Sequence, residues 1–256
     1  MAKLEIELVP ALSDNYVYLA HDSETKATAV VDPAEAPPVL AALERRGWRL
    51  THILNTHHHA DHIGGNAELK AQFGVPIVGP RADAARIPGL DVELGDGDSY
   101  EMGGHAVRVF DTPGHTRGHI SFWFPDDDAL FCGDTLFALG CGRMFEGTPP
   151  QFWTSLLKLR NLPDSTRVYC GHEYTLSNAR FAVTVDPGNR ELADRLREIE
   201  RLRAESKPTI PSLLGLEKRT NPFLRADDAG VQAAVGMSGG DPAQVFGEIR
   251  KRKDSF

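Results

Sequence analysis

The sequence has few cysteines, no long apolar run and no excess of basic residues. Its three cysteines (Cys132, Cys141 and Cys170) are an odd number in apolar or glycine-rich surroundings, which suits unpaired thiols in a reducing compartment. No segment approaches the roughly 18 consecutive apolar residues of a membrane span. The net charge of −8 disfavours nucleic acid as a partner, because a phosphate backbone calls for a basic surplus. We therefore expect a cytoplasmic protein that binds neither membrane nor nucleic acid.

The chain of 256 residues is 41% hydrophobic and 25% charged, and its pattern changes about two thirds of the way along. Up to about residue 172, short apolar runs bounded by turns predict strands, with helices between some of them. The strands are expected at 4–9, 16–20, 27–31, 52–54, 76–78, 107–111, 119–124, 129–132 and 167–170, and the helices at 37–46, 65–73 and 149–159. After Gly171 helical spacing dominates, at 174–185, 190–204 and 242–253. The pattern indicates an α/β body followed by a helical region.

The segment Thr56–His62 carries the strongest chemical signal. Five of its seven residues are histidine or aspartate, and these side chains are ligands that suit zinc and related transition ions. The segment lies between an apolar strand and a helix, so His57 and His59 can point from a loop at one ion. Asp61 and His62 can then serve a second ion nearby. A lone loop histidine is usually just a solvated polar residue, but this density of ligands favours a metal site.

Three later segments each place one histidine or aspartate just past a predicted strand and beside a glycine. The residues are His115, Asp134 and His172. Loops at strand ends can converge while the strands hold them rigid, and glycine lets the backbone approach a site closely. Each residue alone could be a capped or turn residue. The recurrence of one arrangement predicts that the three belong to a common site.

The order His-x-His-x-Asp-His, then single His, Asp and His, resembles the metallo-β-lactamase-fold hydrolases. More narrowly, the chain is similar to the glyoxalase II (hydroxyacylglutathione hydrolase) family along its whole length. The motifs that carry this resemblance are Thr56–Gly65, Gly133–Phe137, Gly140–Arg143, Glu146–Thr148, Cys170–Thr175, Asn221–Arg225 and Gly240–Phe256. The resemblance implies an α/β fold, a four-layer αβ/βα sandwich with a C-terminal helical domain. It implies a catalytic domain over residues 1–173 and a substrate-binding domain over 174–256.

The resemblance also implies that seven residues bind two divalent metal ions. One ion would be held by His57, His59 and His115, the other by Asp61, His62 and His172, and Asp134 would bridge the two. Asp134 and Asp61 would also count as catalytic residues. The penicillin-hydrolysing branch typically uses a cysteine in the second site, so Asp134 argues against that activity. The nitrogen and oxygen ligands suit zinc, with iron or manganese as alternatives.

The implied reaction is hydrolysis of S-(2-hydroxyacyl)glutathione, chiefly S-D-lactoylglutathione, to glutathione and D-lactate, the second step of methylglyoxal detoxification. Two metals about 3.5–4 Å apart can share a hydroxide that attacks the thioester and can clamp a substrate oxygen. The leaving thiolate comes from a thiol with a pKa near ~8.5, so it can depart without a general acid. The sequence offers no convincing second acid motif, which favours thioesters over peptides.

By resemblance, Arg143, Tyr174 and Arg225 contact the glutathione moiety, and arginine can engage a carboxylate through two parallel hydrogen bonds. The chain departs from the animal-type pattern at Phe145, where a tyrosine hydroxyl is lost, and no basic residue closely follows Arg225. The run Arg250–Lys253 is expected to be a solvated helix face. Enzymes of this type are often monomeric, so the resemblance implies a monomer.

Two other classes of function stay open at this point. The first is a mononuclear iron dioxygenase that acts on glutathione persulfide, a branch that is similar through His57-x-His59 and Gly140–Arg143 but usually lacks so long a helical tail. The second is a non-catalytic metal-binding protein, which the complete ligand set disfavours. The acidic charge balance disfavours a metal-dependent nuclease of the same superfamily.

Overall fold

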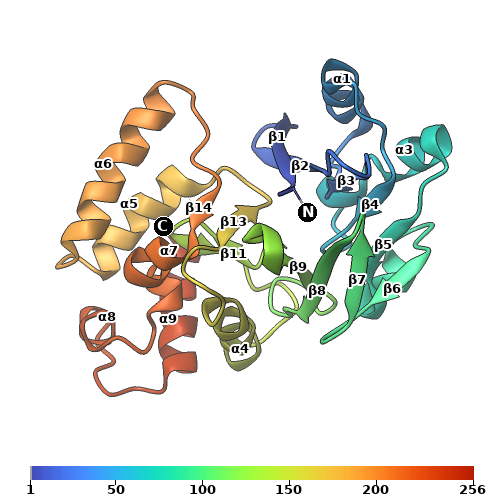
Figure 1. Cartoon of the computed structure of the whole chain (residues 1–256). Helices are drawn as coiled ribbons and strands as arrows, with labels where there is room; N and C mark the ends of the chain where they lie inside the picture. The colour runs from blue at the N-terminus through green and yellow to red at the C-terminus, as the bar shows by residue number, and fades with distance from the viewer. Residues whose placement is uncertain (1) are drawn as a thin grey trace. The chain divides into compact units, whose positions relative to one another are not determined.

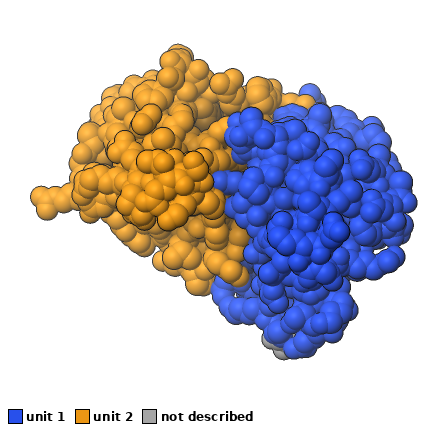
Figure 2. All heavy atoms as spheres, turned by 90° about the horizontal axis from the view of Figure 1, so that it is seen from above, with its two compact units in different colours: residues 1–111, 117–133 blue, residues 112–116, 134–256 orange. Residues whose placement is uncertain are grey.

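The computed structural model describes residues 2–256, and Figure 1 labels its elements. The described chain forms two compact units (Figure 2). Unit 1 runs to Asp111 and resumes over Arg117–Gly133, whereas unit 2 comprises Thr112–Thr116 and Asp134–Phe256. The chain therefore changes unit at 111/112, 116/117 and 133/134.

Unit 1 contains a mixed six-stranded sheet in the order β1-β2-β3-β4-β5-β6. Its strands are β1 (Glu5–Ala11), β2 (Asn15–His21), β3 (Thr28–Val31), β4 (His52–Leu54), β5 (Ile77–Pro80) and β6 (Val92–Leu94). The strands β1 to β3 pair antiparallel, and β3 to β6 pair parallel. Along the chain, the parallel strands are connected by the helices α1 (Ala36–Arg46), α2 (Ala60–Ile63) and α3 (Asn66–Phe73) and by the short η1 (Arg81–Arg86).

An antiparallel array of four strands completes unit 1. Its members are β7 (Ser99–Met102), β8 (His105–Asp111), β9 (Ile120–Phe124) and β10 (Ala129–Gly133), with η2 (Pro125–Asp127) between the last two. The ring of Tyr18 on β2 lies 5.6 Å from that of Phe131 on β10, so the two arrays pack face to face. On the first sheet, Val39 and Leu43 of α1 join Ile53 and Leu69 in one buried core.

Unit 2 is mostly helical. Its helices are α4 (Pro149–Arg160), α5 (Thr175–Val185), α6 (Arg190–Ala204), α7 (Leu214–Thr220), η3 (Pro222–Leu224), α8 (Ala229–Ala234) and α9 (Pro242–Asp254). Its strands are the hairpin β11 (Leu136–Phe137) and β12 (Gly140–Cys141), and the antiparallel pair β13 (Arg167–Cys170) and β14 (Ser212–Leu213). Apolar residues at helical spacing on α6, Leu192, Leu196 and Ile199, pack against α5.

The long periodic segments agree with the sequence prediction, and α6 matches it residue for residue. Asn189 caps α6 by accepting a hydrogen bond from the backbone N–H of Leu192, at 3.1 Å. Several short elements were not predicted from the sequence and acquire their structure from packing, namely β6, β7, β11, β12, β14, α7 and α8. The ligand segment itself contains one short helix, α2, where only a loop was expected.

Candidate metal centre

In unit 1 the predicted ligands lie at the end of a buried parallel strand. β4 ends at Leu54, and His57 follows in the loop with no exposed surface. The ring centroid of His57 lies 4.7 Å from that of His59 and 4.1 Å from that of His62. Gly64 directly follows α2, and a Cβ there would collide with the backbone of Ala34, so glycine permits this close approach. The local fold therefore gathers the histidines of one short segment.

A buried carboxylate orients this segment. Asp32 accepts hydrogen bonds from the backbone N–H and the hydroxyl of Thr56, each at 2.7 Å, and lies 3.1 Å from Nδ1 of His62. Engaging Nδ1 directs Nε2 of the same ring away from the carboxylate, as is usual for metal-bound histidines. Ligand atoms of Asp32, His57 and His62 lie within 4.8 Å of one another. This role of Asp32 was not predicted from the sequence.

The other two polar residues of the segment have separate partners. Asn15 on β2 donates from Nδ2 to Oδ2 and to the backbone carbonyl of Asp61, both at 3.1 Å. His58 lies between the expected ligands, and its Nδ1 is 2.8 Å from Oδ2 of Asp83, a buried carboxylate that also pairs with Arg86. Asn15 thus holds Asp61, while His58 belongs to a different polar cluster.

In unit 2 the predicted ligands converge on one carboxylate oxygen. Oδ2 of Asp134 lies 3.3 Å from Nε2 of His115 and 3.5 Å from Nε2 of His172. Two ligands at about 2.0–2.1 Å from one tetrahedral zinc are about 3.3–3.4 Å apart, so these spacings match metal ligation. All three side chains are buried. Three segments that are distant in the sequence therefore meet at Asp134.

The two histidines of unit 2 are each held from the far side. Nδ1 of His115 lies 2.8 Å from the backbone carbonyl oxygen of Arg143, which accepts its hydrogen bond. His172 stacks on Tyr174 with ring centroids 4.7 Å apart and an angle of 2° between the planes. Both contacts leave Nε2 directed at Asp134.

A cationic cluster lies at the end of α9 in the same unit. Burial, followed by the positive charges of Arg250 and Arg143, lowers the pKa of Lys253 to about 8. Asp254 also belongs to this cluster, 2.9 Å from Arg250 and 4.0 Å from Arg143, so three cations face one carboxylate and the cluster keeps a positive balance. The prediction of a solvated face over Arg250–Lys253 is wrong for Arg250, which is buried and donates from Nη1 to the carbonyl of Cys141 at 2.8 Å. The sequence analysis missed this cluster because spacing alone does not show which face of α9 is covered.

The other expected substrate contacts differ in their surroundings. Arg143 and Tyr174 are exposed, with 66% of the Arg143 side chain accessible. Arg225 is mostly buried, and its guanidinium pairs with Asp186 and Asp228. Arg225 is therefore engaged by two carboxylates of its own unit.

Three further histidines, His21, His105 and His119, are buried, as are the three cysteines. His119 is buried and stacks on His57, with ring centroids 4.8 Å apart. The three cysteines are buried thiols, and burial raises the pKa of Cys141 to about 11 and that of Cys170 to about 12. Such thiols are poor nucleophiles at neutral pH.

Two family models together match residues 11–256. The metallo-beta-lactamase superfamily model matches residues 11–172, and the model of the hydroxyacylglutathione hydrolase C-terminus matches residues 173–256. The chain belongs to the hydroxyacylglutathione hydrolase family. A hydroxyacylglutathione hydrolase of Methylococcus capsulatus is 57% identical over 253 residues, 99% of both chains. One of Rhizobium meliloti is 55% identical over 256 residues, the whole of both chains.

Solved structures agree with this assignment at the level of the fold. ETHE1 from Myxococcus xanthus superposes with a TM-score of 0.67 at 25% identity, covering 99% of both chains. BLEG-1 B3 metallo-beta-lactamase gives a TM-score of 0.66 at 23% identity, covering 86% of this chain and 99% of that one. The resemblance to the hydroxyacylglutathione hydrolase family and the α/β fold class are thus confirmed.

Members of the metallo-β-lactamase superfamily, including the hydroxyacylglutathione hydrolase family, bind divalent metal ions, and the residues present fit such ions. The ligand atoms are imidazole nitrogens and carboxylate oxygens, which suit zinc, iron and manganese. His62 and His115 each engage Nδ1 in an outer hydrogen bond, which is the arrangement that presents Nε2 to a metal. Among residues 2–256, no helix is both long and apolar enough to cross a membrane.

Proposed function

We propose that this chain hydrolyses S-(2-hydroxyacyl)glutathione, chiefly S-D-lactoylglutathione, to glutathione and a 2-hydroxy acid, D-lactate. This reaction is the second step of methylglyoxal detoxification. The observation that carries the proposal is the full-length match to hydroxyacylglutathione hydrolases at 55–57% identity. The iron-dependent persulfide dioxygenase is less well supported, since the relatives at 55–57% identity are named hydroxyacylglutathione hydrolases.

The proposed metal centre has two ions and the seven ligands expected from the sequence. The first ion is assigned to His57, His59 and His115, the second to Asp61, His62 and His172, and Asp134 is assigned to both. The support is the pair of short distances from Asp134 Oδ2 to two histidines, because one oxygen close to two ligands suits a bridging carboxylate. Two divalent ions, most simply zinc, would supply an activated water and positive charge at the reacting carbonyl.

The residues of the chain orient the reactants around that site. Asp134 and Asp61 are the proposed catalytic residues, since each is a carboxylate ligand that can accept a hydrogen bond from the attacking water. Water adds to the thioester carbonyl and loses a proton to solvent, the C–S bond breaks, and the glutathione thiolate departs and takes up a proton from solvent. A thiolate is stable enough to leave without an acid at neutral pH.

Glutathione recognition is assigned to unit 2. Arg143, Tyr174 and Arg225 are the contacts expected from the sequence, and the cluster of Arg143, Arg250 and Lys253 adds an anion site for a glutathione carboxylate. Arg225 would act by holding Asp186 and Asp228 as much as by direct contact. We place the functional boundary between residues 173 and 174, next to the junction of the two family models. A monomer in the cytoplasm stays a prediction.

The decisive experiment combines metal analysis with two assays. Purified protein loaded with zinc should hydrolyse S-D-lactoylglutathione, should lose this activity when a chelator removes the metal, and should regain it when zinc is restored. Two metal ions per chain are expected. Metal-loaded protein without thioesterase activity would contradict the proposed substrate. One iron per chain with oxygen consumption on glutathione persulfide would replace it with the dioxygenase.

A further inference from the structure

The hairpin β11–β12 joins two residues of the proposed site. Asp134 lies two residues before β11, and Arg143 lies two residues after β12. The strands pair Leu136 with Cys141 and Phe137 with Gly140, so the turn is Ala138-Leu139, with Leu139 in the left-handed region at φ 57°. The whole hairpin is buried, and its turn therefore needs partners for its backbone polar groups.

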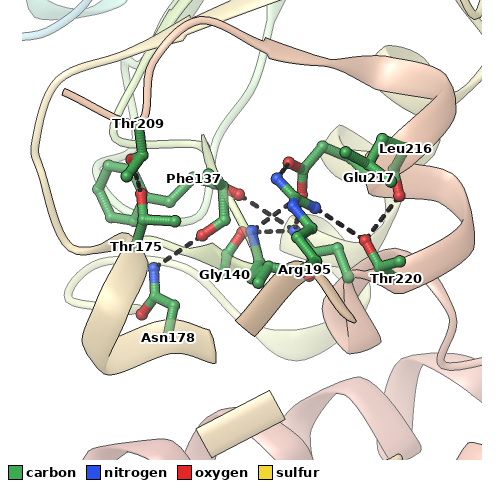
Figure 3. A network of polar contacts seen from close by, with 12 residues as sticks. Phe137, Gly140, Thr175, Asn178, Arg195, Thr209, Leu216, Glu217 and Thr220 are labelled. Atoms are coloured by element: carbon green, nitrogen blue, oxygen red, sulfur yellow. Dashed lines mark hydrogen bonds and ion pairs between the residues drawn. The ribbon is translucent and has the colours of Figure 1, made fainter. Parts of the chain in front are cut away.

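Side chains from two later helices supply those partners (Figure 3). The amide of Asn221 donates from Nδ2 to the carbonyl oxygens of Phe137 at 3.1 Å and Gly140 at 3.0 Å. Asn178 on α5 donates to the carbonyl of Ala138 at 3.2 Å. The backbone N–H of Leu139 donates to Oε2 of Glu217 on α7 at 2.9 Å. Side chains thus hold the turn in addition to the pairing of its two strands.

Glu217 is the centre of this network. It has no exposed surface, its Oε2 also accepts from Asn221 at 3.1 Å, and its Oε1 pairs with Arg195 of α6. Arg195 donates from Nη1 to the hydroxyl of Thr220 at 2.7 Å. A buried ion pair is weak evidence for stability, because its desolvation cost offsets much of the attraction. The role of this ion pair is therefore better explained by the residues that it holds in place.

The hairpin segment in turn contacts two of the proposed metal ligands of unit 2, His115 and Asp134. The carbonyl of Arg143 accepts from Nδ1 of His115 at 2.8 Å, and the N–H of Gly142 donates to the carbonyl of Thr135 at 3.5 Å. A Cβ on Gly142 would collide with the backbone of Asp134 and lie 3.0 Å from Nδ1 of His115. A displaced hairpin would therefore move both Asp134 and His115.

We propose that Glu217, together with Arg195 and Asn221, is a positioning residue for the metal ligands Asp134 and His115. The inference rests on the proposed metal site but not on the identity of the substrate. A role in folding alone would make Glu217 matter for stability and leave metal binding by the folded protein unchanged. The two roles are separated by measuring metal binding itself.

The test compares Glu217→Gln with Arg219→Gln. Arg219 pairs with Glu191 and so joins α7 to α6 as Glu217 does, but its guanidinium contacts Glu191 and the carbonyl of Gly215 rather than the hairpin. Cobalt is titrated into each metal-free protein, and its visible spectrum and competition with a chelator are recorded. We expect Glu217→Gln to bind cobalt about 10–100-fold more weakly with an altered spectrum, and to lower kcat with little change in KM. Arg219→Gln should match the wild type.

Two outcomes would overturn the positioning role. One is folded Glu217→Gln that binds cobalt with wild-type affinity and spectrum, and the other is an equal loss in Arg219→Gln. If Glu217→Gln does not fold, Asn221→Ser decides, because serine can still cap the backbone of Phe223 but cannot reach both carbonyls.

The wild-type protein gives a test that needs no variant. Coupling between the hairpin and the metal is reciprocal, so metal loading should slow hydrogen exchange at the backbone N–H of Leu139 and Gly142 at least severalfold. Unchanged exchange rates at both would contradict the proposal. If the wild type binds metal but does not hydrolyse S-D-lactoylglutathione, the proposed substrate fails while the cobalt and exchange results still decide the positioning role.

Discussion

The two units bring their candidate metal ligands together in different ways. Unit 1 offers four from one stretch of seven residues, Thr56–His62, at the end of a buried strand. Unit 2 offers His115, Asp134 and His172 from three segments, and only its tertiary fold brings them to one carboxylate. Unit 2 also holds the cationic cluster around Lys253. Local sequence is therefore enough to gather the candidate ligands of unit 1, whereas those of unit 2 depend on packing between distant segments.

Removing one ligand from each unit gives the largest expected effect. If both units serve one reaction centre, His57→Ala and Asp134→Ala should each lower kcat about 10³-fold, since the lost stabilisation is several kcal/mol. The exposed Asp126→Ala is the matched control and should be fully active. Thioesterase rates are measured on proteins whose folding is checked by circular dichroism. Near-normal turnover in either ligand variant would show that the unit carrying that residue does not take part in the reaction.

The residues that orient the loop of unit 1 can be compared directly. Asp32→Asn keeps the size of the side chain, and asparagine tolerates the left-handed conformation of this position, φ 50°. We expect metal affinity to fall about 10–100-fold, because the amide cannot accept from both Thr56 and His62.

Asp83→Asn is the control for this experiment, since it perturbs another buried aspartate paired with a histidine of the same loop. It should leave metal affinity near the wild-type value, as judged by chelator competition. Equal losses in the two variants would show that the loop responds to any nearby buried change.

The anion-binding role of unit 2 predicts a smaller effect, confined to KM and dependent on pH. Lys253 is positively charged below its pKa of about 8 and neutral above it. KM for S-D-lactoylglutathione should therefore rise as the pH passes upward through about 8, and substrate binding should shift this midpoint higher. Lys253→Met should raise KM about tenfold at pH 7. It should also abolish the rise in KM near pH 8, with kcat retained.

Lys251→Met, an exposed change on the same helix, is the comparison variant for Lys253. It should keep both the wild-type KM and its pH profile. A pH-dependent KM that persists in Lys253→Met would assign the titration to another group.

The smallest effect is expected from the cysteines, which lie in both units. All three are buried, and the raised pKa of Cys141 leaves little thiolate at pH 8. Iodoacetamide should label the native protein slowly and leave activity unchanged, whereas unfolding should expose all three thiols to rapid labelling. Mass spectrometry of the two samples makes the measurement. Rapid inactivation of the native protein would show that one thiol is accessible near the site.

Strong local patterns allowed much of the fold to be predicted. The 3.6-residue spacing defined α6, and the capped, proline-started α4 was expected within one residue. The short elements β6, β7 and α7 were missed because so few residues cannot show a clear hydrophobic period in the sequence. α7 carries Glu217, so the buried network around the hairpin was invisible for the same reason.

The sequence by itself determined the identities of the seven candidate ligands, the clustering of four of them and the membership of the family. Those properties follow from residue type and spacing along the chain. Only the tertiary structure decided that Asp32 orients His62, that Arg250 is buried, and that Glu217 and Asn221 hold the hairpin beside Asp134. These contacts join residues 30 to about 110 positions apart, and burial, which sets their strength, is a property of the packed chain.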